Sequence, residues 1–222
     1  MVPRRSKRDT SRLDSFRETV VALSATLGRA ISVPELEAFE THYRLLLHWG
    51  RTINLTGLRS EESIVRRHFL EPIAAADLAT GPGKLLDIGS GNGFPAIPLR
   101  VLNPELELIL VEASERKSAF LRAVVRETGL SGVRVETRRL RTAADLADLI
   151  PCRYLTFRAI RGEAILRKGP SGPIVEPGGR AILFVSEGQL KDIERDPLPG
   201  MTFAGSHPLP FSSGSVLAVL EP

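Results

Sequence analysis

Apolar residues recur with a helical period through the first part of the chain. The positions that share this spacing are Leu13, Phe16, Val20, Leu23 and Leu27, and Gly28 can end the helix. Ser32 with Glu35 three residues later forms a capping box, which predicts a second helix running to about Gly50. A third helix is expected from about Glu61 to Leu70, with Pro72 kinking or ending it. The pattern therefore predicts a flexible basic tail over residues 1–12 and a helical part over residues 13–80.

From residue 81 the pattern changes to short apolar runs that alternate with helical stretches. The runs predict strands at residues 84–88, 106–111, 133–135, 154–157, 180–185 and 216–220. Helices are expected after Pro95, around residues 119–125 and, as a short element, around 143–149. Such alternation is typical of an α/β fold with a mainly parallel sheet covered on both faces. The last strand should pair antiparallel with one near residues 201–204, so residues 81–222 are predicted to form this second part.

A glycine-rich stretch follows the first strand. Gly89, Gly91 and Gly93 lack a Cβ, so the backbone can take positive φ and a ligand can lie against it. The dinucleotide fingerprint would need a glycine at the position of Phe94. The second strand ends at Glu112, and a carboxylate there can accept hydrogen bonds from both hydroxyls of a ribose. The glycines and Glu112 together favour a nucleoside-bearing cofactor at the carboxyl ends of the strands.

Composition narrows the class of protein further. The chain has 222 residues, of which 42% are hydrophobic and 25% charged, which is ordinary for a soluble globular protein. No run approaches the ~18 apolar residues that a membrane span needs. The one cysteine, Cys152, excludes an internal disulfide framework and fits a reducing cytoplasm.

The positive charge is concentrated at the start of the chain. The net charge of +4 equals the four basic residues in positions 1–8, and the other charges cancel. A basic arm could neutralise phosphates and strengthen RNA binding, or it could be a solubilising tail. Both interpretations remain open.

Several short motifs occur in the order found in one enzyme family. They are Asn54-Leu55-Thr56, Arg67-His68-Phe69-Leu70, the block from Leu86 to Leu99, Arg116-Lys117 before Phe120-Leu121, Arg158-Ala159 and Pro177-Gly178-Gly179-Arg180. Over about residues 35–190 the chain resembles the 16S ribosomal RNA guanine-N7 methyltransferases, also called glucose-inhibited division protein B. The resemblance implies a Rossmann-like methyltransferase fold with a helical N-terminal extension, S-adenosylmethionine as cofactor and a cytoplasmic location. It also implies 16S rRNA or the small ribosomal subunit as substrate, methylated at a guanine of the 530 loop. The protein is expected to be a monomer.

The resemblance also assigns roles to individual residues. Gly89, Gly91, Gly93 and Phe94 would line the path of the methionine and adenosine, Glu112 would take the ribose, and Leu140 and Arg141 would border the adenine. Arg158 would lie near the cofactor and the target base, and Asn54 and His68 would face the same pocket. His68 could equally be a hydrogen-bonded histidine at a helix end.

The chemistry of guanine N7 agrees with this set of residues. N7 carries an in-plane lone pair and no proton, so the enzyme needs no general base and chiefly has to position the reactants. Arg158 is therefore expected to position groups rather than to transfer protons, and to matter more to turnover than to folding.

Competing chemistries find less support in the sequence. Pro151-Cys152 resembles the cysteine site of cytosine-C5 methyltransferases, but it precedes a strand instead of following one. Four scattered histidines and one cysteine offer no metal cluster.

The chain also departs from the pattern of the family. The departures are Glu71 and Pro72 after His-Phe-Leu, Leu140 and Arg141 beside the adenine, Arg153 at the start of a strand, Glu187 in place of a lysine, and the segment 169–173, which interrupts an expected helix. They leave open a second function, in which a divergent relative binds RNA or protein without this activity, or methylates another substrate.

Overall fold

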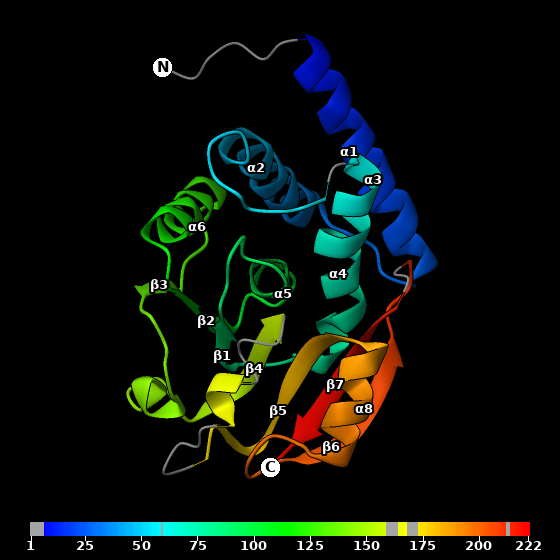
Figure 1. The fold of residues 1–222 in the computed structure, drawn as a ribbon. Helices are drawn as coiled ribbons and strands as arrows, with labels where there is room; N and C mark the ends of the chain where they lie inside the picture. The colour runs from blue at the N-terminus through cyan, green and yellow to red at the C-terminus, as the bar shows by residue number, and fades with distance from the viewer. Residues whose placement is uncertain (1–6, 59, 159–163, 168–172, 212–213) are drawn as a thin grey trace.

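A seven-stranded sheet forms the centre of the molecule (Figure 1). The computed structural model describes residues 7–58, 60–158, 164–167, 173–211 and 214–222. The strands are β1 (Gly83–Ile88), β2 (Leu106–Glu112), β3 (Val133–Thr137), β4 (Cys152–Arg158), β5 (Val175–Ser186), β6 (Thr202–Pro208) and β7 (Ser215–Glu221), in the spatial order β3-β2-β1-β4-β5-β7-β6. Strands β1 to β5 are parallel, and β7 runs antiparallel to both β5 and β6. This confirms the predicted α/β class and its C-terminal antiparallel pair.

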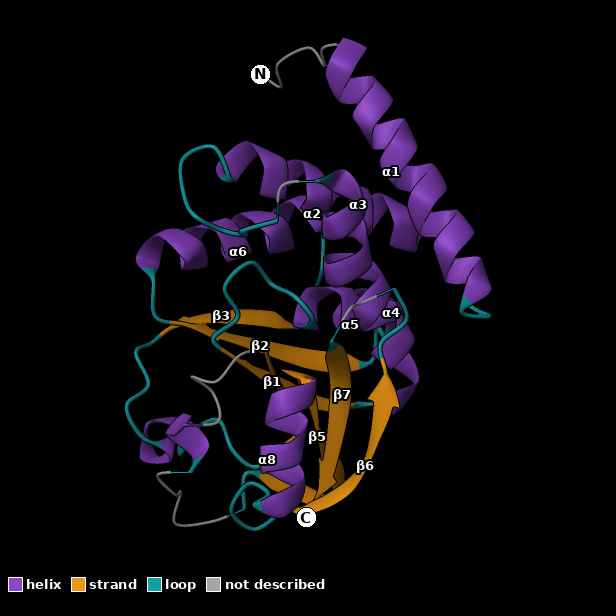
Figure 2. Cartoon of the chain, turned by 45° about the vertical axis from the view of Figure 1, so that its right-hand side comes forward, coloured by secondary structure: helices purple, strands orange, loops and turns teal. Residues whose placement is uncertain are grey.

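Helices cover the two faces of the sheet unequally (Figure 2). They are α1 (Lys7–Thr26), α2 (Val33–Trp49), α3 (Glu61–Ile64), the π-helix η1 (Val65–Leu70), α4 (Glu71–Ala75), the 3-10 helix η2 (Ala76–Leu78), α5 (Ala96–Leu102), α6 (Glu115–Thr128), the 3-10 helix η3 (Ala143–Leu146) and α8 (Glu187–Arg195). Successive strand residues point to opposite faces, so Leu85 joins the core under α1 to α6 and Leu86 joins the core on the side of α8. The helical N-terminal part therefore supplies most of one layer.

Two of the predicted helices have different bounds in the structure. Helix α1 begins at Lys7, inside the predicted tail, because buried Leu13 and Phe16 anchor the helix and Arg12 pairs with Glu61 at 3.5 Å. The expected helix at residues 143–149 is only the 3-10 turn η3. Residues 1–6 of the tail and 169–172 of the interrupting segment lie outside the described ranges.

The predicted third helix does not end at Pro72, and the change in the helix near Pro72 is a π-helical stretch, not a simple kink. The helical run continues from Glu61 to Leu78, and its middle part is π-helical. Pro72 has no N–H to donate, and the N–H of Glu71 just before it bonds back to the carbonyl of Arg66, five residues earlier. The wider turn lets the helix pass the proline.

The predicted turn at Pro177-Gly178-Gly179 lies inside strand β5. The strand starts at Val175, and its pairing with β4 jumps from Cys152↔Val175 to Tyr154↔Arg180, which leaves a bulge. Glycine is required there, because a Cβ on Gly179 would lie 2.3 Å from the carbonyl oxygen of Arg153. None of the described helices is long and apolar enough to cross a membrane.

Candidate functional site

The register of the parallel strands brings the carboxyl ends of β1, β2, β4 and β5 to one edge. Ile88 of β1 lies beside Val111 of β2 and Phe157 of β4, and Arg158 lies beside Phe184 of β5. Strand order reverses at β1, whose neighbours are β2 on one side and β4 on the other. Ligands of open α/β sheets bind at such a reversal, and the glycine loop follows β1 here.

The three loop glycines all have positive φ, but they serve different needs. The values are 72° at Gly89, 54° at Gly91 and 85° at Gly93. A Cβ on Gly89 would meet nothing within 4 Å, so this side of the loop is open to a ligand. A Cβ on Gly93 would lie 2.5 Å from Ile97 Cδ1 and 3.2 Å from His42 Cε1. Gly89 thus leaves room for a bound group, whereas Gly93 is required by packing.

Glu112 is tied to the glycine loop at the end of β2. Its Oε2 accepts a hydrogen bond from the N–H of Gly91 at 2.8 Å, and its Oε1 accepts one from the N–H of Ser114 at 2.8 Å. Each carboxylate oxygen has a further lone pair with which it can accept a hydroxyl. A fixed carboxylate beside the open side of Gly89 fits the ribose of a nucleoside cofactor.

Phe94 does not present its ring to the open side of the loop. The ring is 3% exposed and lies between two imidazoles, with centroids 4.2 Å from His42 and 4.5 Å from His68 and nearly parallel planes. The sequence placed Phe94 on the cofactor path, but this packing leaves only its backbone available for that role.

His68 lies on η1 and is buried, with its ring stacked on Phe94 and its Nε2 near polar side chains. Its Nε2 is 3.1 Å from Thr56 Oγ1 and 3.3 Å from Asn92 Nδ2, while Nδ1 has no partner among the described residues. Burial, followed by the positive charge of Arg158, holds the pKa of His68 well below its usual value. The ring is therefore neutral near pH 7. Asn54, predicted to face the same pocket, is exposed, and its neighbour Thr56 makes the contact with His68 instead.

Arg158 is held from two sides at the end of β4. Its Nη1 forms an ion pair with Glu71 Oε2 at 2.8 Å, and its guanidinium carbon lies 4.9 Å from the centroid of Phe184. Nε and Nη2 are buried without a hydrogen-bond partner in the described part of the chain. Burial lowers the pKa of Arg158, and Glu71 opposes this effect. Glu71, a departure from the family pattern, therefore supplies the counter-charge of the arginine.

A second buried carboxylate lies beneath the loop. Asp87 Oδ1 accepts a hydrogen bond from Thr156 Oγ1 at 2.7 Å, and burial raises the pKa of Asp87 to about 6. The nearby charge of Arg158 acts in the opposite direction. At neutral pH the acid is mostly ionised, so negative charge lies under the site.

Backbone contacts position the segment that should border an adenine. The N–H of Arg138 donates to the carbonyl of Glu112 at 3.0 Å, which places the start of the segment beside the ribose acid. Asp145 Oδ2 accepts from the N–H of Arg141 at 2.7 Å. The side chain of Leu140 packs on the core, and that of Arg141 is exposed. The unusual side chains at these two positions therefore do not set the path of the backbone.

The remaining candidates lie away from this edge or at its margin. Cys152 opens β4 at the opposite edge, where its thiol is buried and donates to the carbonyl of Ile174, and burial raises the pKa of the thiol to about 12. This is not the environment of a nucleophile. Arg153 lies at the same opposite edge, and Glu187 is exposed in the first turn of α8. The described residues contain no group of three or more histidine, cysteine, aspartate or glutamate side chains that could hold a metal ion.

The sequence did not predict a site role for four residues that the structure brings to the site, and Glu71 stood out only as a departure from the family pattern. These are His42, Thr56, Glu71 and Asn92. The contacts of His42, Thr56 and Asn92 join α2, η1 and the loop before α3 to the glycine loop, and Glu71 joins α4 to Arg158 of β4. The block that carried the resemblance includes Asn92, and the motifs include Thr56. Only their contacts with His68 distinguish them from neighbouring residues.

Comparisons with a family model and with known proteins indicate the same family. The family model of rRNA small subunit methyltransferase G matches residues 35–197. Proteins named ribosomal RNA small subunit methyltransferase G are similar over most of their length. The one from Dehalococcoides mccartyi is 34% identical over 206 residues, covering 84% of this chain and 86% of that protein. The one from Geobacter sp. is 29% identical over 187 residues, covering 82% and 83%.

Solved structures agree on the fold alone. Ribosomal protein L11 methylase from Lactobacillus delbrueckii subsp. bulgaricus has a TM-score of 0.54 at 13% identity, covering 68% of this chain and 76% of that one. Precorrin-6y C5,15-methyltransferase from Geobacter metallireducens has a TM-score of 0.50 at 12% identity, covering 76% and 91%.

Proposed function

The chain belongs to the rRNA small subunit methyltransferase G family, and from this premise we propose that it methylates N7 of a guanine in the 530 loop of 16S ribosomal RNA, with S-adenosylmethionine as donor. The observation that carries the cofactor assignment is the Glu112 carboxylate, hydrogen-bonded to the Gly91 N–H beside the open side of Gly89. The family and the resemblance of the motifs support the RNA target.

The residues at the sheet edge have separate tasks in this proposal. Glu112 accepts the ribose hydroxyls, and Gly89 leaves space for the cofactor, which supplies an activated methyl group on a sulfonium. The loop backbone orients the cofactor because the Gly91 N–H is fixed to Glu112. The segment that follows Arg138 borders the adenine through its backbone.

The reaction at N7 requires positioning rather than proton transfer. His68 is neutral and buried, so it is suited to holding Asn92 and Thr56 in place and not to acting as an acid. Arg158 has its charge balanced by Glu71, and its Nε and Nη2 are buried without a hydrogen-bond partner among the described residues. Those donors suit a base edge or a phosphate of the RNA. Positive charge moves onto the guanine during transfer, and the carboxylate of Asp87 beneath the loop favours that shift.

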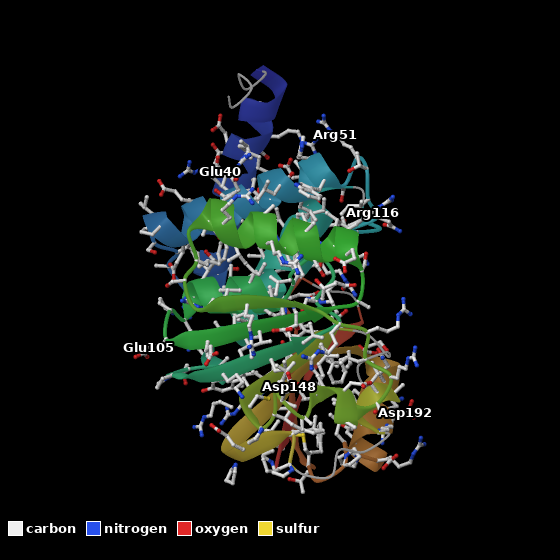
Figure 3. All side chains as sticks on the ribbon, turned by 90° about the vertical axis from the view of Figure 1, so that its left-hand side faces the viewer. Glu40, Arg51, Glu105, Arg116, Asp148 and Asp192 are labelled. Carbon is white, nitrogen blue, oxygen red and sulfur yellow. The ribbon has the colours of Figure 1, made fainter. Side chains whose placement is uncertain are left out.

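Exposed arginines around this edge can bind RNA phosphates. Arg51 follows α2 and Arg116 lies in the first turn of α6. Figure 3 shows both on the same side of the molecule, opposite Glu105, which lies just before β2. Exposed basic residues in adjoining segments are Arg67, Arg139 and Arg141. Neutralising phosphates supplies much of the affinity for RNA, and the basic residues in positions 1–8 would add to it.

One chain forms the whole candidate site, so we propose a monomer. The proposed substrate places it in the cytoplasm. Exposed Glu187, the first residue of α8, favours the second candidate, a divergent relative without this activity, because an acid near the site repels the phosphates of the proposed RNA target.

Two measurements test the proposal. Calorimetry should show S-adenosylmethionine binding to the wild type that is lost in Gly91→Val, since a branched side chain at φ 54° displaces the N–H that holds Glu112. Gly28→Val is the matched control, because Gly28 also has positive φ, lies in open space after α1 and is remote from the site. Small ribosomal subunits lacking the modification should then accept methyl groups at a guanine N7. RNA binding without transfer would favour the second candidate, and transfer to another atom would refute the N7 assignment.

A further inference from the structure

The glycine loop is held by the helical extension as well as by its own strand. Asn92 and Phe94 flank Gly93, and both contact histidines from helices that precede the sheet in sequence. His42 comes from α2 and His68 from η1. The extension thus contacts the segment that should bind the cofactor.

The hydrogen bond from His42 has a defined direction. Its Nε2 lies 2.9 Å from the carbonyl oxygen of Asn92, which can only accept, so Nε2 carries the proton. Burial lowers the pKa of His42 to about 4, and the residue is only 1% exposed. The ring is therefore the neutral Nε2–H form at neutral pH, and Nδ1 has no hydrogen-bond partner among the described residues.

This bond acts on the part of the loop that lies between two glycines. Asn92 lies between two glycines, which by themselves allow the backbone many conformations. The N–H of Gly91, one residue before Asn92, holds the Glu112 carboxylate. Fixing the carbonyl of Asn92 restricts the same short backbone segment that sets the geometry of Gly91 and Glu112.

We propose that His42 is a positioning residue for the cofactor. By donating to Asn92 and stacking on Phe94, it holds the loop in the conformation in which the Gly91 N–H and the Glu112 carboxylate are ready to receive the ribose. The inference rests on the proposed function. Cofactor affinity then depends on a side chain of the N-terminal extension that does not itself touch the ligand.

Two substitutions separate the hydrogen bond of His42 from its stacking. His42→Phe keeps a flat ring against Phe94 but removes the donor. His42→Gln places an amide N–H2 near the position of Nε2 but removes the ring. His48→Phe, at an exposed site on the same helix, is the matched control.

The dissociation constant for S-adenosylmethionine is measured by calorimetry well below the midpoint of thermal unfolding. We expect His42→Phe to weaken binding about tenfold, the equivalent of one hydrogen bond of ~1.4 kcal/mol. His42→Gln should bind more tightly than His42→Phe even though its loss of packing lowers the melting temperature further. At saturating cofactor the transfer rate of His42→Phe should approach that of the wild type, and His48→Phe should match the wild type throughout.

Each possible result decides the matter. Equal affinities of the wild type and folded His42→Phe overturn the inference, as do variants whose affinities follow their melting temperatures. If His42→Phe does not fold, His42→Gln decides: affinity near that of the wild type supports the donor, and strong loss refutes it. A wild type that does not bind S-adenosylmethionine overturns the proposed function, and this inference with it.

Discussion

At the scale of single residues, the ion pair between Arg158 and Glu71 means that a substitution of Arg158 affects folding as well as function. From its place after a strand we expected Arg158 to affect turnover more than stability. The ion pair adds a cost to folding, because Glu71 is 1% exposed and would be left as an unpaired buried charge if Arg158 were removed. Breaking a buried pair by removing one partner typically costs ~3–5 kcal/mol. A simple truncation of Arg158 therefore confuses loss of function with loss of folding.

A double variant separates the two effects. Arg158→Met should lower the free energy of unfolding by about 3 kcal/mol, and adding Glu71→Leu should recover most of that loss because no charge remains buried. Urea unfolding measures both quantities. Methyl transfer should stay abolished in the stable double variant if Arg158 positions the RNA. Recovery of transfer together with stability would show instead that Arg158 acts only through the fold.

The same scale shows which candidate residues the sequence could bring together and which it could not. The glycines and Glu112 could be located because each follows a strand, and the carboxyl ends of parallel strands meet at one edge. The ring of Phe94 could not be placed, since its contact with His42 depends on how α2 docks on the loop. For the same reason the sequence could not distinguish Asn54, which is exposed, from Thr56, which contacts His68.

At the scale of elements, the π-helix η1 just before Pro72 differs from what the rule for proline in helices predicts. The missing N–H of proline was expected to kink or end the helix. Instead the preceding residues form a π-helix, which directs His68 toward Phe94 and leads into Glu71, the partner of Arg158. π-Helical turns frequently occur at functional sites. Strands were easier to predict, because buried parallel strands are short apolar runs bounded by turn residues.

Pro72→Ala tests whether the π-helix is needed. Alanine restores an N–H that can bond to the carbonyl of His68 and favours an α-helix, which would turn His68 away from its present contacts. We expect methyl transfer to fall at least tenfold while the melting temperature stays the same or rises. The control is Pro34→Ala in the first turn of α2, where no helical N–H bond is expected. Unchanged transfer in Pro72→Ala would show that the wider turn is incidental.

For the whole molecule, the distribution of exposed charge predicts how RNA approaches. Replacing Arg51 and Arg116 by glutamine should weaken RNA binding and lower the slope of log affinity against log salt by about 1 to 2, with cofactor affinity unchanged. Arg126→Gln with Arg195→Gln removes the same net charge from arginines paired with Glu127 and Asp192, and serves as the control. RNA binding by both double variants is measured from low to moderate salt. Equal losses of RNA affinity in the two variants would mean that RNA binding depends only on the total charge of the protein.

The shared core also constrains the order in which the protein can mature on a ribosome. One hydrophobic cluster joins Phe16, Phe39 and Phe69 of the helical extension to Phe120 and to Ile182 in β5. Translation produces the first three long before the last, so the extension emerges with its apolar side uncovered. Native packing there has to wait until β5 has been synthesised, because contacts distant in sequence form only when both partners exist. Until the later strands have been synthesised, the exposed apolar side of the N-terminal helices is the part of the nascent chain that needs protection from aggregation.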